Sequence, residues 1–159
     1  MTLSDLGNLG GLVGGIAVAG TLVYLALQVR LSAEIARATM RQSLVQNQIA
    51  HMSLRSTDPM IRTAFRKASA HEQLDDDEAF ALLFHATVGI RMWEASHYQF
   101  ARRMLSDDDW NSIREIMFIH FQLPIYRQAL IRLGRRGVNP SFLAEANRIV
   151  EQTQKQGSR

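Results

Sequence analysis

The sequence predicts an all-α protein in which one N-terminal transmembrane helix continues into a cytoplasmic helical bundle. Three observations predict this class. Residues 6–29 carry no charge, apolar residues recur at helical spacing through the rest of the chain, and no stretch shows the strict alternation of a strand. The 159 residues are 47% hydrophobic and contain no cysteine, which excludes a disordered chain, a disulfide scaffold and thiol catalysis.

The uncharged segment at residues 6–29 is long enough to cross a membrane. Its 24 residues would form a helix of about 36 Å, against about 30 Å for a hydrocarbon core. A cleaved signal peptide is one alternative, although no Lys or Arg precedes the segment. A buried helix of a soluble protein is another, because the glycines, Asn8 and Thr21 weaken insertion. We expect residues 1–30 to be a retained transmembrane anchor.

Charges that flank the segment predict its orientation. The leading tail carries only Asp5 and the amino terminus, whereas Arg30, Arg37 and Arg41 follow the segment. Basic residues are enriched on the cytoplasmic side of membrane helices, so we expect the C-terminal domain to be cytoplasmic. The same three arginines could contact anionic lipid headgroups.

Small residues recur every fourth position in the segment, at Gly7, Gly11, Gly15 and Ala19. This spacing lets two helix backbones approach closely in lipid, where packing drives association. It predicts a helix–helix interface and hence a homo-oligomer. The alternative is that the membrane helix merely tolerates these glycines.

The membrane helix is expected to continue beyond the anchor, because no Pro or Gly lies between Thr21 and Asp58. One face of this continuation resembles a coiled-coil seam, in which Gln42 is the polar position. The seam comprises Leu31, Ile35, Ala38, Gln42, Val45, Ile49 and Met52. It could pair with a second chain, but packing against the chain's own later helices is the favoured interpretation.

Capping signals and prolines predict where the later helices begin. Asp58 precedes Pro59, Asp75 precedes Glu78 by three residues, and Ser106 precedes Asp109 by three. Pro124 and Pro140 should begin two more helices. We expect a cytoplasmic helical domain at residues 31–153 and a flexible tail at 154–159. The helix after Asp75 is expected to supply the centre of the core through Phe80, Leu83, Phe84, Thr87, Val88, Ile90, Trp93 and Met104.

The clearest candidate for chemistry is a polar cluster of Arg91, Glu94, His97 and Tyr98. Glu94 and His97 share a helical face, as in the Glu-x-x-His motifs of di-iron bundles. Only one copy of the motif occurs, so no metal ligand, cofactor or catalytic residue is assigned. Acidic residues are interspersed among the basic ones, which argues against a nucleic-acid partner.

Residues 14–30 end in Tyr24-Leu25-Ala26-Leu27-Gln28-Val29-Arg30 and resemble the opening of a widespread group of small bacterial membrane proteins. Weaker matches are residues 74–80, Glu94, Tyr98, Leu105, Trp110 and Pro124. Met104 departs from the group, which often has glycine there. The resemblance implies an N-terminal transmembrane helix and a helical cytoplasmic domain at the bacterial inner membrane. It implies no particular activity.

Three hypotheses for function follow. The leading one is a non-enzymatic, membrane-anchored interaction or scaffold protein whose partners are the lipid bilayer, further copies of itself and an unidentified protein. The second is a small metal-binding or enzymatic helical bundle centred on Glu94 and His97. The third is a homo-oligomeric membrane pore, although the segment has no ionisable residue of the kind that marks an ion path.

Overall fold

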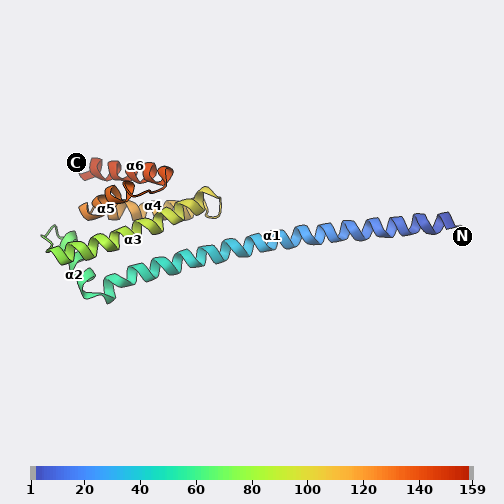
Figure 1. Cartoon of the computed structure of the whole chain (residues 1–159), viewed down its shortest axis with the longest axis horizontal. Coiled ribbons are helices and arrows are strands. Elements are labelled where there is room, and N and C mark those ends of the chain that lie inside the picture. The colour runs from blue at the N-terminus through green and yellow to red at the C-terminus, as the bar shows by residue number, and fades with distance from the viewer. Residues whose placement is uncertain (1–2, 158–159) are drawn as a thin grey trace. The chain divides into compact units, whose positions relative to one another are not determined.

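The structure is a computed structural model that describes residues 3–157, with side-chain surroundings for residue 11 and residues 13–155. The described residues form six helices and no strand, which confirms the all-α class (Figure 1). The helices are α1 (Leu3–Thr57), α2 (Pro59–Ser69), α3 (Asp76–Ala101), α4 (Asp107–Phe121), α5 (Pro124–Gly134) and α6 (Pro140–Gly157).

The chain divides into two compact units, Met1–Met40 and Arg41–Arg159. In its described part the first unit consists of α1 alone. The second contains the remaining residues of α1 together with α2 to α6. The second unit therefore begins ten residues after the predicted domain boundary at residues 30 and 31.

Within the first unit, α1 is long and apolar enough to span a membrane, judged by length and composition. Every side chain described between residues 13 and 29 is exposed. The chain itself therefore does not cover this apolar surface. Among the described residues, α1 is the one helix that meets these criteria.

The predicted helix starts are confirmed in their local chemistry. The Asp58 carboxylate accepts hydrogen bonds from the backbone N–H groups of Met60 and Ile61. Asp75 and Glu78 form a capping box at α3, and Ser106 and Asp109 form another at α4. These side chains satisfy backbone N–H groups that have no partner within the helix.

The two later prolines also begin helices, as predicted. Pro124 is the first residue of α5 and Pro140 the first of α6. Residues 154–157 were expected to belong to a flexible tail, whereas α6 continues to Gly157. The side chain of Thr153 is buried near this end, and its hydroxyl donates to the carbonyl of Val150 at 2.7 Å.

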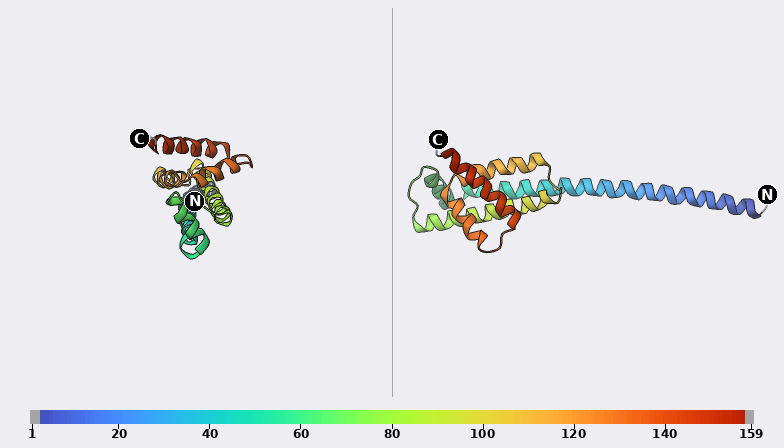
Figure 2. Two further views of the ribbon diagram at one scale, coloured as in Figure 1. Left: turned by 90° about the vertical axis from the view of Figure 1, so that its left-hand side faces the viewer. Right: turned by 90° about the horizontal axis from the view of Figure 1, so that it is seen from above.

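The second unit is built around α3, which packs against α2, α4, α5 and α6 (Figure 2). Helices α4 and α6 also pack against each other. Residues of α3 to α6 and of the loop before α6 form one continuous core. Its fully buried members include Ile90, Met117, Phe121, Tyr126, Phe142 and Ile149.

The core face of α3 differs from the prediction at several positions. Ile90 and Trp93 are buried as expected, but Phe80 is 72% exposed and Phe84 65% exposed. Leu82 and Ala86 are fully buried in their place. Apolar residues occur on both sides of this helix, so periodicity alone does not select the inward face. The inward face of α3 is instead determined by the neighbouring helices α2 and α5, which pack against it.

The burial of Leu82 and the exposure of Phe84 predict very different effects for truncating these two side chains. Leu82→Ala should lower the free energy of unfolding by about 2–5 kcal/mol, because it opens a cavity in a closed core. Phe84→Ala should change it by less than about 0.5 kcal/mol, since its ring is solvated. Urea unfolding of the full chain in mild detergent, followed by tryptophan fluorescence, measures both. A larger loss for Phe84→Ala would contradict the assignment.

Candidate functional site

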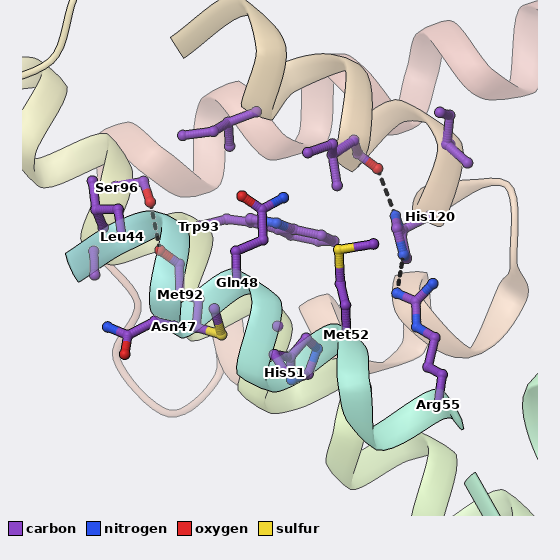
Figure 3. A pocket seen from close by; sticks show the side chains of 15 residues that line it. Leu44, Asn47, Gln48, His51, Met52, Arg55, Met92, Trp93, Ser96 and His120 are labelled. Carbon is purple, nitrogen blue, oxygen red and sulfur yellow. Dashed lines mark hydrogen bonds between the residues drawn. The ribbon is translucent and has the colours of Figure 1, made fainter. Parts of the chain in front are cut away.

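A cavity of about 300 Å³ lies in the second unit, between α1, α3 and α4 (Figure 3). Its walls are mainly apolar and include Leu44 and Met52 from α1, Met92 and Trp93 from α3, and Ile113 and Ile116 from α4. This volume lies at the lower end of the range for small-molecule pockets, about 300–1,000 Å³. The cavity combines apolar residues of three helices with one charged group.

The charged group is Arg55, near the C-terminal end of α1. Its Nε–H donates to Nε2 of His85 at 3.4 Å. Its Nη2 contacts Nε2 of His120, as Figure 3 shows. The guanidinium carbon also lies 4.3 Å from the centre of the Phe65 ring. No carboxylate among the described residues forms an ion pair with it. Arg55 is therefore a half-buried cation held by neutral partners.

The hydrogen bonds of Arg55 determine the proton positions on two histidines. A guanidinium can only donate, so Nε2 must be the acceptor in both rings. The proton of His120 is then on Nδ1, which donates to the carbonyl of Ile116 at 2.7 Å. The proton of His85 is likewise on Nδ1, a buried atom without a hydrogen-bond partner among the described residues. The local positive charge is concentrated on Arg55.

Burial keeps these groups uncharged. It lowers the pKa of His85 from 6.5 to about 3, and the neighbouring His51, Arg55 and His120 act in the same direction. Burial also lowers the pKa of His120. It raises the pKa of the Tyr126 hydroxyl from 10 to about 12, against the opposing charge of Arg55. A second cation in this cluster is disfavoured, whereas an anion would be attracted.

Gly89 allows α1 to approach α3 at this cluster. A Cβ atom at Gly89 would lie 3.0 Å from Nε2 of His51. The His51 ring thus passes directly over the backbone of α3 and stacks on His85, with ring centres 3.9 Å apart. A glycine inside a helix costs about 1 kcal/mol relative to alanine, so this close approach is its structural reason.

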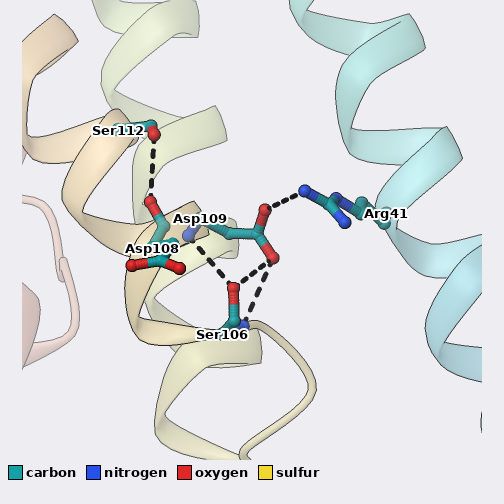
Figure 4. Close-up of polar contacts among 5 residues, drawn as sticks. All are labelled: Arg41, Ser106, Asp108, Asp109 and Ser112. Carbon is teal, nitrogen blue, oxygen red and sulfur yellow. Dashed lines mark hydrogen bonds and ion pairs between the residues drawn. The ribbon is translucent and has the colours of Figure 1, made fainter.

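An ion pair between Arg41 and Asp109 attaches α1 to α4 at the other end of the cavity wall (Figure 4). A guanidinium nitrogen of Arg41 lies 2.7 Å from Oδ1 of Asp109, while Oδ2 accepts a hydrogen bond from the hydroxyl of Ser106, also at 2.7 Å. The bond from Ser106 and the charge of Arg41 lower the pKa of Asp109. Because Asp109 also completes the capping box of α4, one carboxylate joins two helices.

The polar cluster predicted at Arg91, Glu94, His97 and Tyr98 is divided in the structure. Glu94 forms an ion pair with Arg91 at 2.6 Å and accepts the backbone N–H of Asn139 at 2.7 Å. Both of its oxygens are thus engaged, and the one that accepts from Asn139 attaches the loop before α6 to α3.

The other two members of that predicted cluster face different surroundings. His97 packs its ring against Trp110 and Phe142, and burial lowers its pKa. Tyr98 is 46% exposed and stacks with Arg102. Among the described residues, no group of three His, Asp or Glu side chains is arranged to hold a metal ion. The geometry supplies no third ligand for a metal centre at Glu94 and His97.

The predicted residues of α1 have varied surroundings. A Cβ at Gly11 or Gly15 would meet no atom within 4 Å, and Ala19 is exposed, whereas Gly7 lies outside the described side chains. Arg30 pairs with Glu34 at 3.5 Å on the exposed surface, and Arg37 is exposed. Arg41 pairs with Asp109 at 2.7 Å while most of its side chain stays exposed, and the expectation that these three arginines contact lipid headgroups stays a prediction.

Most of the seam of α1 does not pack inside the chain, although Met52 also lines the cavity. Val45 is 49% exposed and Ile49 is 62% exposed, so the favoured intrachain interpretation is wrong at these positions. The half-buried residues of this part are instead Leu44, Gln48, His51 and Arg55. Contacts of His51 and Arg55 with α3 and α4 orient the helix so that this mixed face is inward.

The chain matches no protein-family model, no curated protein and no solved structure. The site must therefore be interpreted from its own geometry. Sequence reasoning missed Arg55, His51, His85 and His120, because these residues are brought together from three helices. Gly89 was the available signal, as an isolated glycine within a long helical pattern marks a close approach.

The neutral state of His85 predicts an acid-sensitive fold. Its pKa is about 3 when folded and 6.5 ordinarily, so the unfolded chain binds more protons between these values. Stability should therefore be complete above pH 6.5 and fall as the pH is lowered from there. The thermal midpoint of the full chain, followed by tryptophan fluorescence, should decrease between about pH 7 and about pH 5.

Two variants test the source of this pH dependence. His85→Gln retains an acceptor for Arg55 but cannot titrate, so it should reduce the slope of the profile, whereas His51, whose pKa burial lowers to about 4, should carry part of the remaining slope. His71→Asn is the control, because His71 is exposed and has φ of 58°, a conformation that asparagine tolerates. An unchanged slope in His85→Gln would show that this histidine does not carry the effect.

The contact between Gly89 and His51 predicts coupling between two substitutions. In a His51→Ala background, Gly89→Ala should stabilise the protein by up to about 1 kcal/mol through helix propensity. With His51 present, the gain should be smaller by at least about 0.5 kcal/mol, because the new methyl group displaces the ring. Urea unfolding of the four proteins forms the cycle. Equal effects in both backgrounds would contradict this close approach.

Proposed function

We propose that this protein is a membrane-anchored helical interaction protein that self-associates. The observation that carries the proposal is the uncharged, apolar part of α1, whose described side chains are all exposed. We further propose the bacterial inner membrane as its location, with the second unit in the cytoplasm. The proposal includes membership of the group of small bacterial membrane proteins that residues 14–30 resemble.

Exposure of the apolar segment supports anchoring. Large side chains such as Ile16, Leu22 and Val23 are each more than 60% exposed. Placing such a continuous surface in water is unfavourable, at about 25 cal/mol for each Å². A bilayer removes this surface from water, and a helix satisfies its own backbone hydrogen bonds there.

The glycines of α1 support self-association. Added Cβ atoms at Gly11, Gly14, Gly15 and Gly20 would meet nothing within 4 Å, so packing within the chain does not require glycine at these positions. Each glycine nevertheless weakens the helix in water by about 1 kcal/mol. A close contact with another helix in lipid would account for the stripe at Gly7, Gly11, Gly15 and Ala19.

Apolar residues on the surface of the second unit support an interaction role. Val45, Ile49 and Met52 present a seam on α1, and Phe80 and Phe84 project from α3 into solvent. Such exposed groups favour contact with a further copy of the chain or with another protein.

Cysteine crosslinking in isolated membranes tests the proposal, and the chain has no native cysteine to interfere. The full chain should remain in the membrane pellet after alkaline extraction. Ala19→Cys should form disulfide-linked dimers on mild oxidation, because this face would bring two helices together. Adding Gly11→Leu and Gly15→Leu to Ala19→Cys should reduce the dimer strongly.

Matched controls use the opposite side of the same helix. Gly20→Cys lies far from the stripe by helical periodicity and should crosslink poorly. Ala17→Leu with Gly20→Leu introduces the same two leucine side chains, with one methyl group less added volume, away from the stripe and should leave the Ala19→Cys dimer unchanged. Release by alkaline extraction would reject the anchor. Equal crosslinking at positions 19 and 20 would reject the interface.

A further inference from the structure

We propose that the cavity between α1, α3 and α4 binds a single-chain aliphatic carboxylate, a free fatty acid, with its carboxylate on Arg55 and its chain along Met52, Trp93 and Leu44. The site is independent of the glycine stripe and extends the protein's role from interaction to ligand binding. It rests on the cavity, on its one charged residue and on the apolar walls.

The positive charge of Arg55 favours a ligand with an anionic headgroup. Among the described residues, Arg55 is the only charged one that lines the cavity, and its partners, which include His85, His120 and the Phe65 ring, are all uncharged. A half-buried cation without a counterion is unfavourable, and a carboxylate is its natural bidentate partner. The histidine contacts use only part of its five N–H donors. An anion at this position would complete an ion pair that the described residues do not supply.

The arrangement of the lining residues favours a ligand with a long aliphatic chain. Arg55 and His120 lie at one end of the view in Figure 3, and Leu44 and Ser96 lie at the other, with Met52 and Trp93 between them. Residues 44–55 of a helix extend over about 16 Å, which sets the length available along this wall. Beyond the Arg55 end the walls are mainly apolar, with Asn47, Gln48 and Ser96 as the uncharged polar residues among them. This arrangement matches an amphiphile with one anionic end.

The volume of the cavity favours a ligand with one acyl chain over a lipid with two. At about 300 Å³, the cavity is small for a phospholipid with two acyl chains and a large headgroup. A free fatty acid has one chain and a planar carboxylate that fits the guanidinium fork. A neighbouring bilayer would provide a local supply of such molecules for a membrane-anchored protein.

Tryptophan quenching by a brominated fatty acid tests the site in the full chain. The protein is placed in phosphatidylcholine nanodiscs, which avoids detergent as a competing amphiphile. Bromoundecanoate should quench Trp93, which lines the cavity, in a saturable manner, and unlabelled dodecanoate should reverse the quenching. Trp110→Phe should retain the signal, whereas Trp93→Phe should lose it. Bromoundecanol, which has the same chain without the charge, should bind at least about tenfold more weakly.

Variants of the headgroup site provide the specific control. Arg55→Gln should weaken bromoundecanoate by at least about tenfold and remove its advantage over the alcohol. Arg66→Gln removes an exposed cation outside the cavity and should leave both affinities unchanged. Leu44→Phe, which adds no further tryptophan, provides a second test if Arg55→Gln does not fold. It fills the distal end from a half-buried position, so it should weaken bromoundecanoate but spare bromohexanoate.

Several outcomes would overturn the proposal. Equal quenching of Trp93 and Trp110, without saturation, would mean partition into the bilayer alone. Equal binding of the acid and the alcohol would remove the role of Arg55. Displacement by a two-chain phosphatidic acid but not by dodecanoate would assign the cavity to a phospholipid. The quenching of Trp93 could also disappear as the protein self-associates, while dodecanoate fails to compete. That result would assign the cavity to a second copy of the chain.

Discussion

The contacts of the Arg55 guanidinium are the interaction on which the attachment of α1 to the other helices of the second unit depends. The guanidinium connects α1 to His85 of α3 and His120 of α4, and it contacts Phe65 of α2. No residue between 41 and 57 is buried, so burial of apolar side chains contributes little to holding α1 in place. Polar contacts take that role, and their strength depends on the histidines remaining neutral acceptors.

The cavity is a consequence of this mode of attachment. The Arg41–Asp109 ion pair and the Arg55 cluster hold α1 at two places, and the residues between them form one wall of the cavity. Exposed ion pairs are worth little, typically about 0–1 kcal/mol, so the Arg41 contact positions the helix more than it stabilises it. Elements held in this way lie at the low end of the local stability range. A ligand that supplied a counterion to Arg55 and apolar contact to Met52 would therefore stabilise α1 as well as occupy the site.

Local features of the fold were predictable from sequence, whereas the choice of packing faces was not. Asp58, the Asp75–Glu78 pair and the Ser106–Asp109 pair begin helices through contacts within four residues, so short-range spacing is sufficient to identify them. The inward face of α3 was missed because Phe80 and Phe84 make it apolar on both sides. Only the neighbouring helices decide which side is covered.

The candidate site was still less predictable, because its members are distant in the sequence. His85 lies 30 residues after Arg55 in the sequence, and His120 lies 65 residues after it. A lone histidine on an apolar face has no recognisable spacing, and a mixed face on α1 is not expected to be turned inward. Gly89 was informative in retrospect, since a glycine that interrupts a strong helical pattern requires a reason such as the His51 ring.

Met52 belongs both to the cavity wall and to the exposed seam of α1, which it shares with Val45 and Ile49. A second α1 that packed along the seam would contact Met52 and thereby change the cavity wall. If the cavity binds a ligand and the seam binds a second chain, occupancy of one must then alter the affinity of the other. Thermodynamic linkage makes that effect reciprocal and equal in magnitude, whichever sign it has.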